Sequence, residues 1–422
     1  MARKMKDSGI EWIGEIPEGW SIARGKHILT LLQRAVSPTD GVITCFRDGE
    51  VTLRSNRRED GFTVSLKEIG YQGIEPGDLV VHGMDGFAGS IGISDSRGKS
   101  SPVLVVLDSS QDKKYLMYYL RSMAYNNVFL ALSTGIRVRS CDLKWNKLAD
   151  LLYLVPPIVE QHKLVSFLDE KCSEIDAMLS KTHSSIEEYK KLKQAVITQA
   201  VTKGVRGERE MKDSGVDWIG EIPEEWNKCK LKNISIDIGD GLHGTPKFDD
   251  SGEVYFINGN NFSSEYVEPK FDTKKLCLEE SLNYPKPELT EQTIMISLNG
   301  SYGKVCLYRY FPMLLGKSAG YITLLPSINR RYVRYYLSST PAQIIMTLSL
   351  NGTTIPNLSL NTLYNFPTIL PSASEQTEIA DYLDAKCAEI DKLIAKKEQL
   401  VKALESYKKS LIYEVVTGKR EV

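Results

Sequence analysis

Two stretches of the chain carry a seam of residues spaced alternately by four and three positions. The first seam consists of Leu168, Cys172, Ile175, Leu179, Thr182, Ile186 and Tyr189. The second has the same steps near the end of the chain and consists of Leu383, Cys387, Ile390, Ile394, Lys397, Val401 and Leu404. A largely apolar seam with this period predicts an amphipathic helix that packs as a coiled coil. Both seams continue with the same irregular steps, through Leu192, Val196 and Ala200 and through Tyr407, Leu411 and Val415.

The two predicted helices are expected to pack against each other. Each has about 40 residues and is about 60 Å long, so its apolar stripe needs a partner of the same length. The polar seam residues Thr182 and Lys397 favour one register at some cost in stability. The alternative is that each helix lies separately on a globular domain.

The helices belong to a longer internal duplication. Met5–Trp20 returns as Met211–Trp226 with 13 of 16 positions identical, and the helical string Leu168–Leu179 returns as Leu383–Ile394. Repeats of this length exclude a short-period solenoid, whose units have about 20 to 50 residues. They predict a pseudo-twofold molecule, which suits a target with two related halves such as a DNA duplex.

The segments between the repeated strings are rich in Gly, Asn and β-branched residues, which predicts α/β or β-rich domains. Apolar runs predict strands at Leu79–Val81, Val103–Leu107 and Tyr321–Leu325. Fainter similarities pair Gly77–Ile93 with Glu291–Leu307, Gly98–Ser100 with Gly316–Ser318, and Tyr118–Leu120 with Tyr335–Leu337. We therefore expect one ancestral domain that was duplicated and then diverged.

Composition limits the choice of function. The 422 residues are 42% hydrophobic, and the net charge of −1 is poor support for a protein that binds phosphates unaided. Residues 21–155 and 227–366 carry net charges of +3 and +2, and the rest of the chain carries −6. Seven cysteines without a CxxC pair and five scattered histidines indicate reduced thiols and no metal site. Without an apolar run of about 18 residues, the sequence favours a cytoplasmic protein.

Motifs for catalysis or nucleotide binding are missing. The Gly-Lys-Ser triplets at Gly98–Ser100 and Gly316–Ser318 lack the upstream glycine of a phosphate-binding loop. We find no dinucleotide fingerprint, no base-methylation loop and no convincing nucleophile constellation. The sequence therefore predicts a non-catalytic protein.

Residues suited to reading DNA bases occur in both variable segments. Arginine can bond guanine O6 and N7, and asparagine can bond adenine in the same bidentate way. In the first segment the candidates follow an expected strand at Glu50–Leu53 or a Thr134-Gly135 turn, and they are Arg54, Asn56, Arg57, Arg58, Arg137 and Arg139. In the second they are His243, Thr245, Lys247, Asn258, Asn260, Asn261, Asn299, Tyr302, Lys304, Thr353 and Thr354. The alternatives are a solvated ion-pair surface for the arginines and ordinary turn chemistry for the Gly-Asn-Asn string.

Together these strings resemble the specificity subunit of type I restriction-modification enzymes. The resemblance depends on DSGIEWIGEIPEGW and its repeat DSGVDWIGEIPEEW, on the helix entries that begin at Glu160-Gln161 and Glu375-Gln376, and on the helix exits Ala200–Gly204 and Val415–Lys419. Cys45–Phe62 and the string that starts at Gly239 are also similar to recognition domains of that family. The resemblance covers nearly the whole chain.

The resemblance implies an α/β fold with two target-recognition domains separated by two long antiparallel coiled-coil helices. The expected division is 1–157 and 207–371 for the domains, and 158–206 and 372–422 for the helical regions. Each domain would read one half of a bipartite, asymmetric site in double-stranded DNA. The helices would dock two methyltransferase subunits, which restriction subunits then join. S-adenosylmethionine, ATP and Mg²⁺ would belong to those partner subunits, with no cofactor in this chain.

Two other functions remain open at this point. The chain could be a coiled-coil scaffold whose α/β domains bind protein without DNA specificity. It could also be a nuclease or methylase whose active site lacks a recognisable motif. Neither explains the duplicated helices joined to diverged domains as well as a DNA-recognition subunit does.

Overall fold

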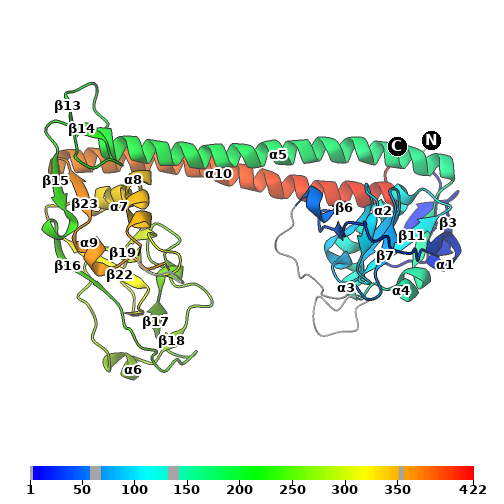
Figure 1. The fold of residues 1–422 in the computed structure, drawn as a ribbon, viewed down its shortest axis with the longest axis horizontal. Coiled ribbons are helices and arrows are strands. Elements are labelled where there is room, and N and C mark those ends of the chain that lie inside the picture. Colours follow the sequence, from blue (N-terminus) through cyan, green and yellow to red (C-terminus); the bar gives the residue numbers. More distant parts are fainter. Residues whose placement is uncertain (1–2, 58–67, 132–141, 351–355) are drawn as a thin grey trace. The chain divides into compact units, whose positions relative to one another are not determined.

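The computed structural model describes residues 3–57, 68–131, 142–350 and 356–422, which form two compact units (Figure 1). Unit 1 comprises Met1–His183 and Gln399–Val422, and unit 2 comprises Ser184–Glu398. Both borders fall inside long helices, α5 (Ile158–Lys203) and α10 (Ala373–Val416). Each unit therefore contains one globular domain and part of both helices.

The centre of unit 1 is a four-stranded antiparallel sheet. Its order is β4 (Leu29–Leu31), β11 (Leu104–Ser109), β8 (Leu79–His82) and β9 (Ile91–Ile93). Helix α2 (Lys113–Tyr125) contacts this sheet and begins at Asp112, whose side chain accepts hydrogen bonds from two backbone N–H groups of the first turn. The expected strands at Leu79–Val81 and Val103–Leu107 are confirmed, and their apolar side chains form much of the core.

Unit 2 repeats this arrangement. Its sheet has the order β16 (Ser235–Asp240), β22 (Ala319–Leu324), β19 (Thr293–Ser297) and β20 (Val305–Leu307). Helix α7 (Arg330–Ser338) contacts it and is capped by Asn329 in the same way as Asp112 caps α2. The duplication seen in the sequence is therefore a duplication of fold, and the predicted α/β class is confirmed.

The remaining strands and helices surround these sheets. In unit 1 they are the pairs β1 (Met5–Asp7) with β2 (Glu15–Pro17), β3 (Ser21–Arg24) with β12 (Leu152–Val155), β5 (Ile43–Cys45) with β6 (Val51–Leu53), and β7 (Gln72–Ile74) with β10 (Gly98–Ser100), and the helices α1 (Gly25–Ile28), α3 (Val128–Ala131) and α4 (Trp145–Asp150). In unit 2 they are β13 (Met211–Asp213) with β14 (Glu221–Pro223), β15 (Asn227–Lys230) with β23 (Pro367–Leu370), the sheet β18 (Lys275–Leu276), β17 (Val254–Ile257) and β21 (Met313–Leu315), and the helices α6 (Leu278–Leu282), α8 (Thr340–Leu348) and α9 (Leu360–Tyr364). The β1–β2 and β13–β14 hairpins have the same register, because Met5 pairs with Pro17 in the first and Met211 pairs with Pro223 in the second.

Helices α5 and α10 run antiparallel within each unit. In unit 1, Lys408 Nζ lies 2.6 Å from Asp176 Oδ1. In unit 2, Lys193 Nζ lies 2.6 Å from Asp391 Oδ2. In the internal repeat Asp391 is the copy of Asp176 and Lys408 is the copy of Lys193, so the two ion pairs are copies of each other. The predicted pairing of the helices is confirmed.

Most of the heptad part of each seam is buried as predicted, whereas Leu179, Tyr189, Ile394, Lys397 and Leu404 are partly exposed. Leu168 and Leu383 are fully buried, and Cys172 and Cys387 have the same low exposure. Thr182 is also buried, and its hydroxyl donates to the Met178 carbonyl one turn earlier at 2.7 Å. Such a bond satisfies the polar group inside the helix at little cost.

The continuation of each seam was predicted wrongly at one position. Leu192 and its copy Tyr407 are half exposed, at 47% and 50%. Past the last heptad the steps change, so the inward face moves to Ile197 and Val201, which are buried. A helix with 3.6 residues per turn drifts from a strict heptad, and the packing surface drifts with it.

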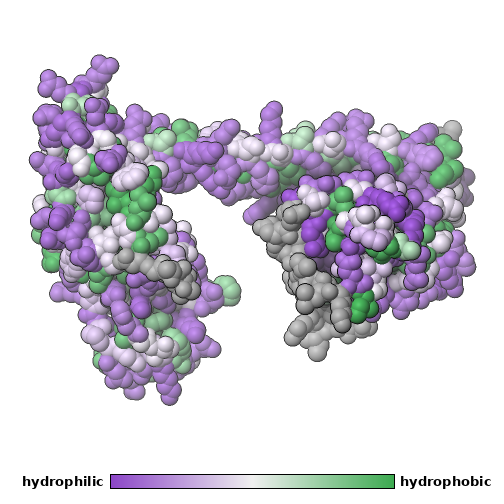
Figure 2. All heavy atoms as spheres, in the orientation of Figure 1, coloured by the Kyte–Doolittle hydropathy of each residue, from purple (hydrophilic) through white to green (hydrophobic). Residues whose placement is uncertain are grey.

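Hydrophilic side chains cover most of the visible face of each unit (Figure 2). An exception is the patch on α8, where Ile344 and Leu348 are 38% and 63% exposed. Within the described residues, no helix combines the length and the apolar character needed to cross a bilayer.

Candidate nucleic-acid interface

The described candidates of unit 1 lie at the end of the β5–β6 hairpin, and they are Arg54, Asn56 and Arg57. Strand β6 is followed by a 3₁₀ turn at Arg54–Asn56, so the expected strand before these residues is confirmed. Thr44 of β5 pairs with Thr52 of β6. Arg54 Nε donates to Thr44 Oγ1 at 3.3 Å, and Asn56 Nδ2 donates to Thr52 Oγ1 at 2.9 Å. The hairpin therefore fixes both side chains through its threonines.

Arg57 is held from three sides. Its guanidinium carbon lies 4.2 Å from the centre of the Phe46 ring. Its two amino nitrogens lie 2.6 Å from Asp48 Oδ2 and 3.0 Å from Glu50 Oε2. The hydrogen bond to Asp48 is the main cause of a raised pKa for the Arg57 guanidinium. The side chain is thus fixed and charged, with 38% of its surface exposed.

A cleft of about 660 Å³ in unit 1 is lined by Phe46, Asp48, Arg54 and Arg57, together with Arg47, His82 and Asp85. His82 Nδ1 accepts from the backbone N–H groups of Asp85 at 2.9 Å and Met84 at 3.3 Å. The proton of the neutral ring must therefore be on Nε2, which makes His82 a hydrogen-bond donor. Burial lowers the pKa of His82 and so favours this neutral form.

Unit 2 gathers its candidate asparagines around the turn Gly316–Ser318. Ser318 Oγ accepts from the Gly259 N–H and donates to Asn258 Oδ1, both at 3.0 Å. Asn299 Nδ2 donates to the Lys317 carbonyl at 3.5 Å. Asn260 is exposed beside them. The second Gly-Lys-Ser string, which the sequence excluded as a nucleotide site, thus organises a polar surface.

Asn261 has a supporting position instead. It is 5% exposed, its Oδ1 accepts from the Asn258 N–H at 3.0 Å, and its Nδ2 donates to Thr273 Oγ1 at 2.8 Å. Thr273 Oγ1 also accepts from the Lys270 N–H at 2.7 Å. Asn261 therefore joins two turns, and both ends of its amide group are already occupied.

The other candidates of unit 2 fall into two groups. His243, Thr245 and Lys247 are exposed, and His243 Nε2 lies 2.7 Å from Asp240 Oδ2. Leu242 forms a bridge with Gly316, which brings the His243 segment to the asparagine surface. Tyr302 lies further away, and its hydroxyl donates to Thr347 Oγ1 at 3.2 Å on α8.

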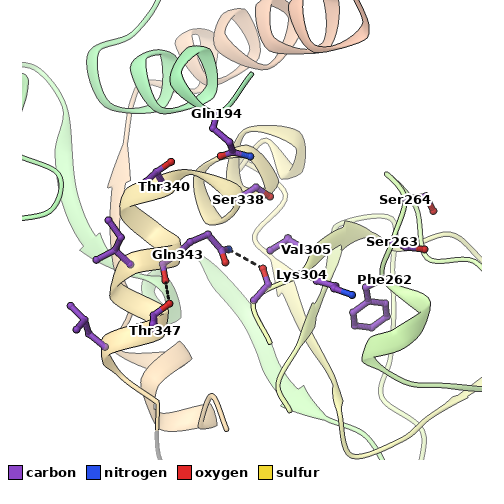
Figure 3. Close-up of a pocket in the computed structure, with 13 residues that line it drawn as sticks. Gln194, Phe262, Ser263, Ser264, Lys304, Val305, Ser338, Thr340, Gln343 and Thr347 are labelled. Carbon is purple, nitrogen blue, oxygen red and sulfur yellow. Dashed lines mark hydrogen bonds between the residues drawn. The ribbon is translucent and has the colours of Figure 1, made fainter. Parts of the chain in front are cut away.

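Lys304 lines a cleft of about 870 Å³ between α8, the C-terminal part of α5 and the β19–β20 turn (Figure 3). Gln343 points into this cleft and donates to the Gly303 carbonyl at 2.9 Å. Gln194 of α5 faces it from the opposite side. Lys304 therefore lies at this cleft, and its backbone N–H donates to Ser297 Oγ at 2.9 Å.

Several residues of these surfaces were not predicted from the sequence. They are Phe46, Arg47, Asp48, Glu50, His82 and Ser318. Most of them lie inside strings that the resemblance had already marked, but no residue-level signal distinguished them. The candidates Arg58, Arg137, Arg139, Thr353 and Thr354 lie outside the described residues. No group of three or more His, Cys, Asp or Glu residues suited to a metal ion occurs within the described ranges.

Comparison with known proteins gives a consistent result. Residues 223–403 match the family described as type I restriction modification DNA specificity domain. The putative type I restriction enzyme MjaX specificity subunit of Methanocaldococcus jannaschii is 24% identical, covering 97% of this chain and 96% of its own. The MjaVIII specificity subunit of the same organism is 27% identical over 77% of this chain and 75% of its own. The chain is therefore similar to type I specificity subunits over most of its length.

Two solved structures share the fold. One is a chain from work on complex assembly and conformational transition of the type I R-M system, with a TM-score of 0.74, 15% identity, and coverage of 96% of this chain and 99% of that one. The HsdS subunit of Thermoanaerobacter tengcongensis has a TM-score of 0.50 and 16% identity, with coverage of 96% and 98%. The curated relatives are named specificity subunits, which agrees with the predicted non-catalytic role.

Proposed function

We propose that this chain is a type I specificity subunit that reads a bipartite, asymmetric DNA sequence, with one half read by residues 21–155 and the other by residues 227–366. The observation that carries this proposal is a shared framework with different polar groups. Both domains have the same four-stranded antiparallel sheet and the same capped helix. On this framework unit 1 presents arginines with carboxylates, and unit 2 presents asparagines with a serine. Different groups on equal frameworks suit two different half-sites.

The paired helices α5 and α10 are proposed to dock two methyltransferase subunits, which restriction subunits then join. S-adenosylmethionine, ATP and Mg²⁺ are proposed to bind those partners. The low net charge of −1 supports this division of labour. Phosphate contacts require clustered Lys and Arg, and partner subunits can supply them.

An exchange of domains tests the proposal. Residues 21–155 are replaced by the equivalent segment of another specificity subunit, the complex is assembled with its methyltransferase, and the methylated sequence is mapped on genomic DNA. One half of the site should change while the other half stays the same. The matched control exchanges residues 227–366, and it should alter only the opposite half. If both halves change together in either chimera, independent reading is wrong.

The alternative is a scaffold that binds protein without DNA specificity. It predicts that the assembled complex methylates DNA without sequence preference, or that neither exchange changes the methylated sequence. The same mapping experiment therefore separates the two functions.

A further inference from the structure

The turn between β5 and β6 is rigid and presents charged groups in fixed positions. The Phe46 N–H donates to the Glu50 carbonyl at 2.8 Å, and the Gly49 N–H donates to the Phe46 carbonyl at 2.9 Å. Gly49 has a φ of 89°, and a Cβ there would collide with the guanidinium of Arg121. Asp48 Oδ1 accepts from the Glu50 N–H at 3.1 Å. Before DNA arrives, the turn is therefore already in one conformation.

Arg57 completes this turn as part of an ion-paired cluster. Its two amino nitrogens each use one hydrogen on Asp48 and Glu50, which leaves a second hydrogen on each nitrogen. The two carboxylates are about half exposed, at 52% and 51%, so their remaining lone pairs face solvent. The cluster thus presents donors and acceptors side by side.

The charge of this cluster is unsuited to phosphate. One guanidinium between two carboxylates has a net charge of −1, and the neighbouring Arg47 is paired with Asp85 at 3.1 Å. A phosphate that approached Arg57 would meet Asp48 and Glu50 at short range, and like charges repel. Uncharged base edges do not have this penalty.

A G·C pair matches the cluster in the major groove. Guanine offers two acceptors, O6 and N7, and the paired cytosine offers the N4 amino donor beside them. Arg57 has two N–H groups for the guanine, and a carboxylate can accept from the cytosine. An A·T pair fits less well, because adenine offers a single acceptor, N7, next to its own amino donor.

We propose that Asp48, Glu50 and Arg57 are specificity-determining residues that read one G·C pair of the unit 1 half-site and exclude phosphate from this part of the surface. This inference rests on the proposed function, since it assumes that residues 21–155 read DNA. It adds two carboxylates to the reading surface and names the base pair that they recognise.

The test uses the full subunit assembled with its methyltransferase. The dissociation constant is measured on the mapped cognate duplex, and on duplexes in which each pair of the unit 1 half-site is substituted in turn, at several salt concentrations. Arg57→Ala should weaken cognate binding about 5-fold to 150-fold and remove discrimination at one G·C position. The slope of log K against log salt should stay the same, because no phosphate contact is lost. Arg57→Lys should not restore discrimination, since an ammonium lacks the planar fork.

The carboxylates are tested with Glu50→Gln and Asp48→Asn. Each should strengthen binding to non-cognate DNA and steepen the salt slope by up to about 0.9, because removing a carboxylate lets the arginine bind phosphate. Arg97→Ala is a matched control, since Arg97 is also held by an Asp and a Glu, at 3.4 Å and 3.0 Å, but lies outside the cleft. It should change neither discrimination nor the slope. Hydrogen exchange of the β5–β6 hairpin verifies that each variant is folded.

Three results would overturn the inference. A uniform loss on all sequences with a shallower slope in Arg57→Ala would make Arg57 a phosphate contact. Relaxed discrimination at an A·T pair would give the wrong base. Unchanged binding by folded variants would remove the cluster from the interface. In each case the wild-type complex still reads two independent half-sites, whereas failure of the proposed function would abolish that independence in the domain exchange.

Discussion

Substitution of the buried ionisable residue Glu375 is expected to destabilise unit 2 around Trp226. Only 2% of its side chain is exposed. Its Oε2 accepts a hydrogen bond from the Trp226 indole N–H at 2.9 Å. Its Oε1 lies 2.7 Å from Arg209 Nη2, and the two form an ion pair without a well-aligned hydrogen bond. The Arg209 guanidinium carbon also lies 5.1 Å from the Trp226 ring centre. Glu375→Gln therefore removes the buried one of two carboxylate partners of Arg209 and leaves the exposed Glu225, whose Oε1 lies 2.8 Å from Arg209 Nη1.

The expected loss of stability in Glu375→Gln depends on how deeply its partners are buried. Breaking a buried ion pair by removing one partner costs about 3 to 5 kcal/mol. The Arg209 side chain is 13% exposed, and Arg206 provides a second, more exposed cation 4.0 Å from Glu375. Partial access of water, the retained hydrogen bond to Trp226 and the remaining ion pair of Arg209 with Glu225 place the expected loss at the lower limit, about 3 kcal/mol.

The internal repeat supplies a matched control. Glu160 is the copy of Glu375, and it pairs with Arg3 at 2.5 Å, where the side chains are 24% and 28% exposed. The Trp20 indole nitrogen is buried without a hydrogen-bond partner within the described ranges. Arg3 lies over the Trp20 ring at 5.5 Å, as Arg209 lies over Trp226. Because this pair is more solvated and Glu160 accepts no hydrogen bond from Trp20, Glu160→Gln should cost about 0.2 to 1 kcal/mol.

Hydrogen–deuterium exchange measures both effects locally. Peptides from Met211–Trp226 and Met5–Trp20 have nearly the same sequence, so their intrinsic exchange rates are comparable. Exchange of the first should accelerate about 100-fold in Glu375→Gln, and that of the second less than about 5-fold in Glu160→Gln. Equal acceleration in both variants, or a change of less than about 5-fold in the first, would refute the argument from burial.

Three further predictions concern the paired helices and His82. Asp176→Lys should destabilise the paired helices by about 0.2 to 1 kcal/mol, and adding Lys408→Asp should restore thermal stability at low salt, whereas failure to restore it would mean that the ion pair is not formed. Burial holds the pKa of His82 below 6.5, so the contribution of neutral His82 to stability should be complete above about pH 6.5 and be lost as the pH falls below this value. In His82→Asn the Asn Oδ1 can replace Nδ1 as the acceptor, so the pH dependence of hydrogen exchange in β8 and β9 should become weaker. An unchanged pH dependence would exclude His82 as its cause. Cys172→Ala and Cys387→Ala should each lower the free energy of unfolding by about 1 kcal/mol through lost packing. Both native thiols should resist alkylation, because burial raises the pKa of each. Rapid modification by iodoacetamide would show instead that the thiols are accessible.

The sequence alone determined the elements whose signal is local or repeated. The spacing from Leu168 onwards predicted one helix and its copy from Leu383 predicted the other, because a heptad of apolar residues has one stable solution at that length. Nearly identical strings at Met5–Trp20 and Met211–Trp226 had to form the same hairpin, because the same residues have the same local preferences. The α/β class and the duplicated domain followed from the same patterns.

The inward face of the helices beyond the heptads was decided by tertiary structure. Leu192 and Tyr407 are apolar or aromatic and stand at plausible steps, yet they are half exposed. Which side of a helix is covered depends on the surface of its partner, and residue spacing does not describe that surface once the period changes.

The candidate DNA surface depended even more on contacts between distant residues. The sequence identified Arg57 as suitable for reading bases, but only the fold placed Asp48, Glu50 and Phe46 around it. Asn261 has the same chemistry as its neighbours in the sequence, yet its amide group is used to join two turns. A side chain's type limits which hydrogen bonds it can make, whereas the folded chain determines which of those bonds are already made and which remain for DNA.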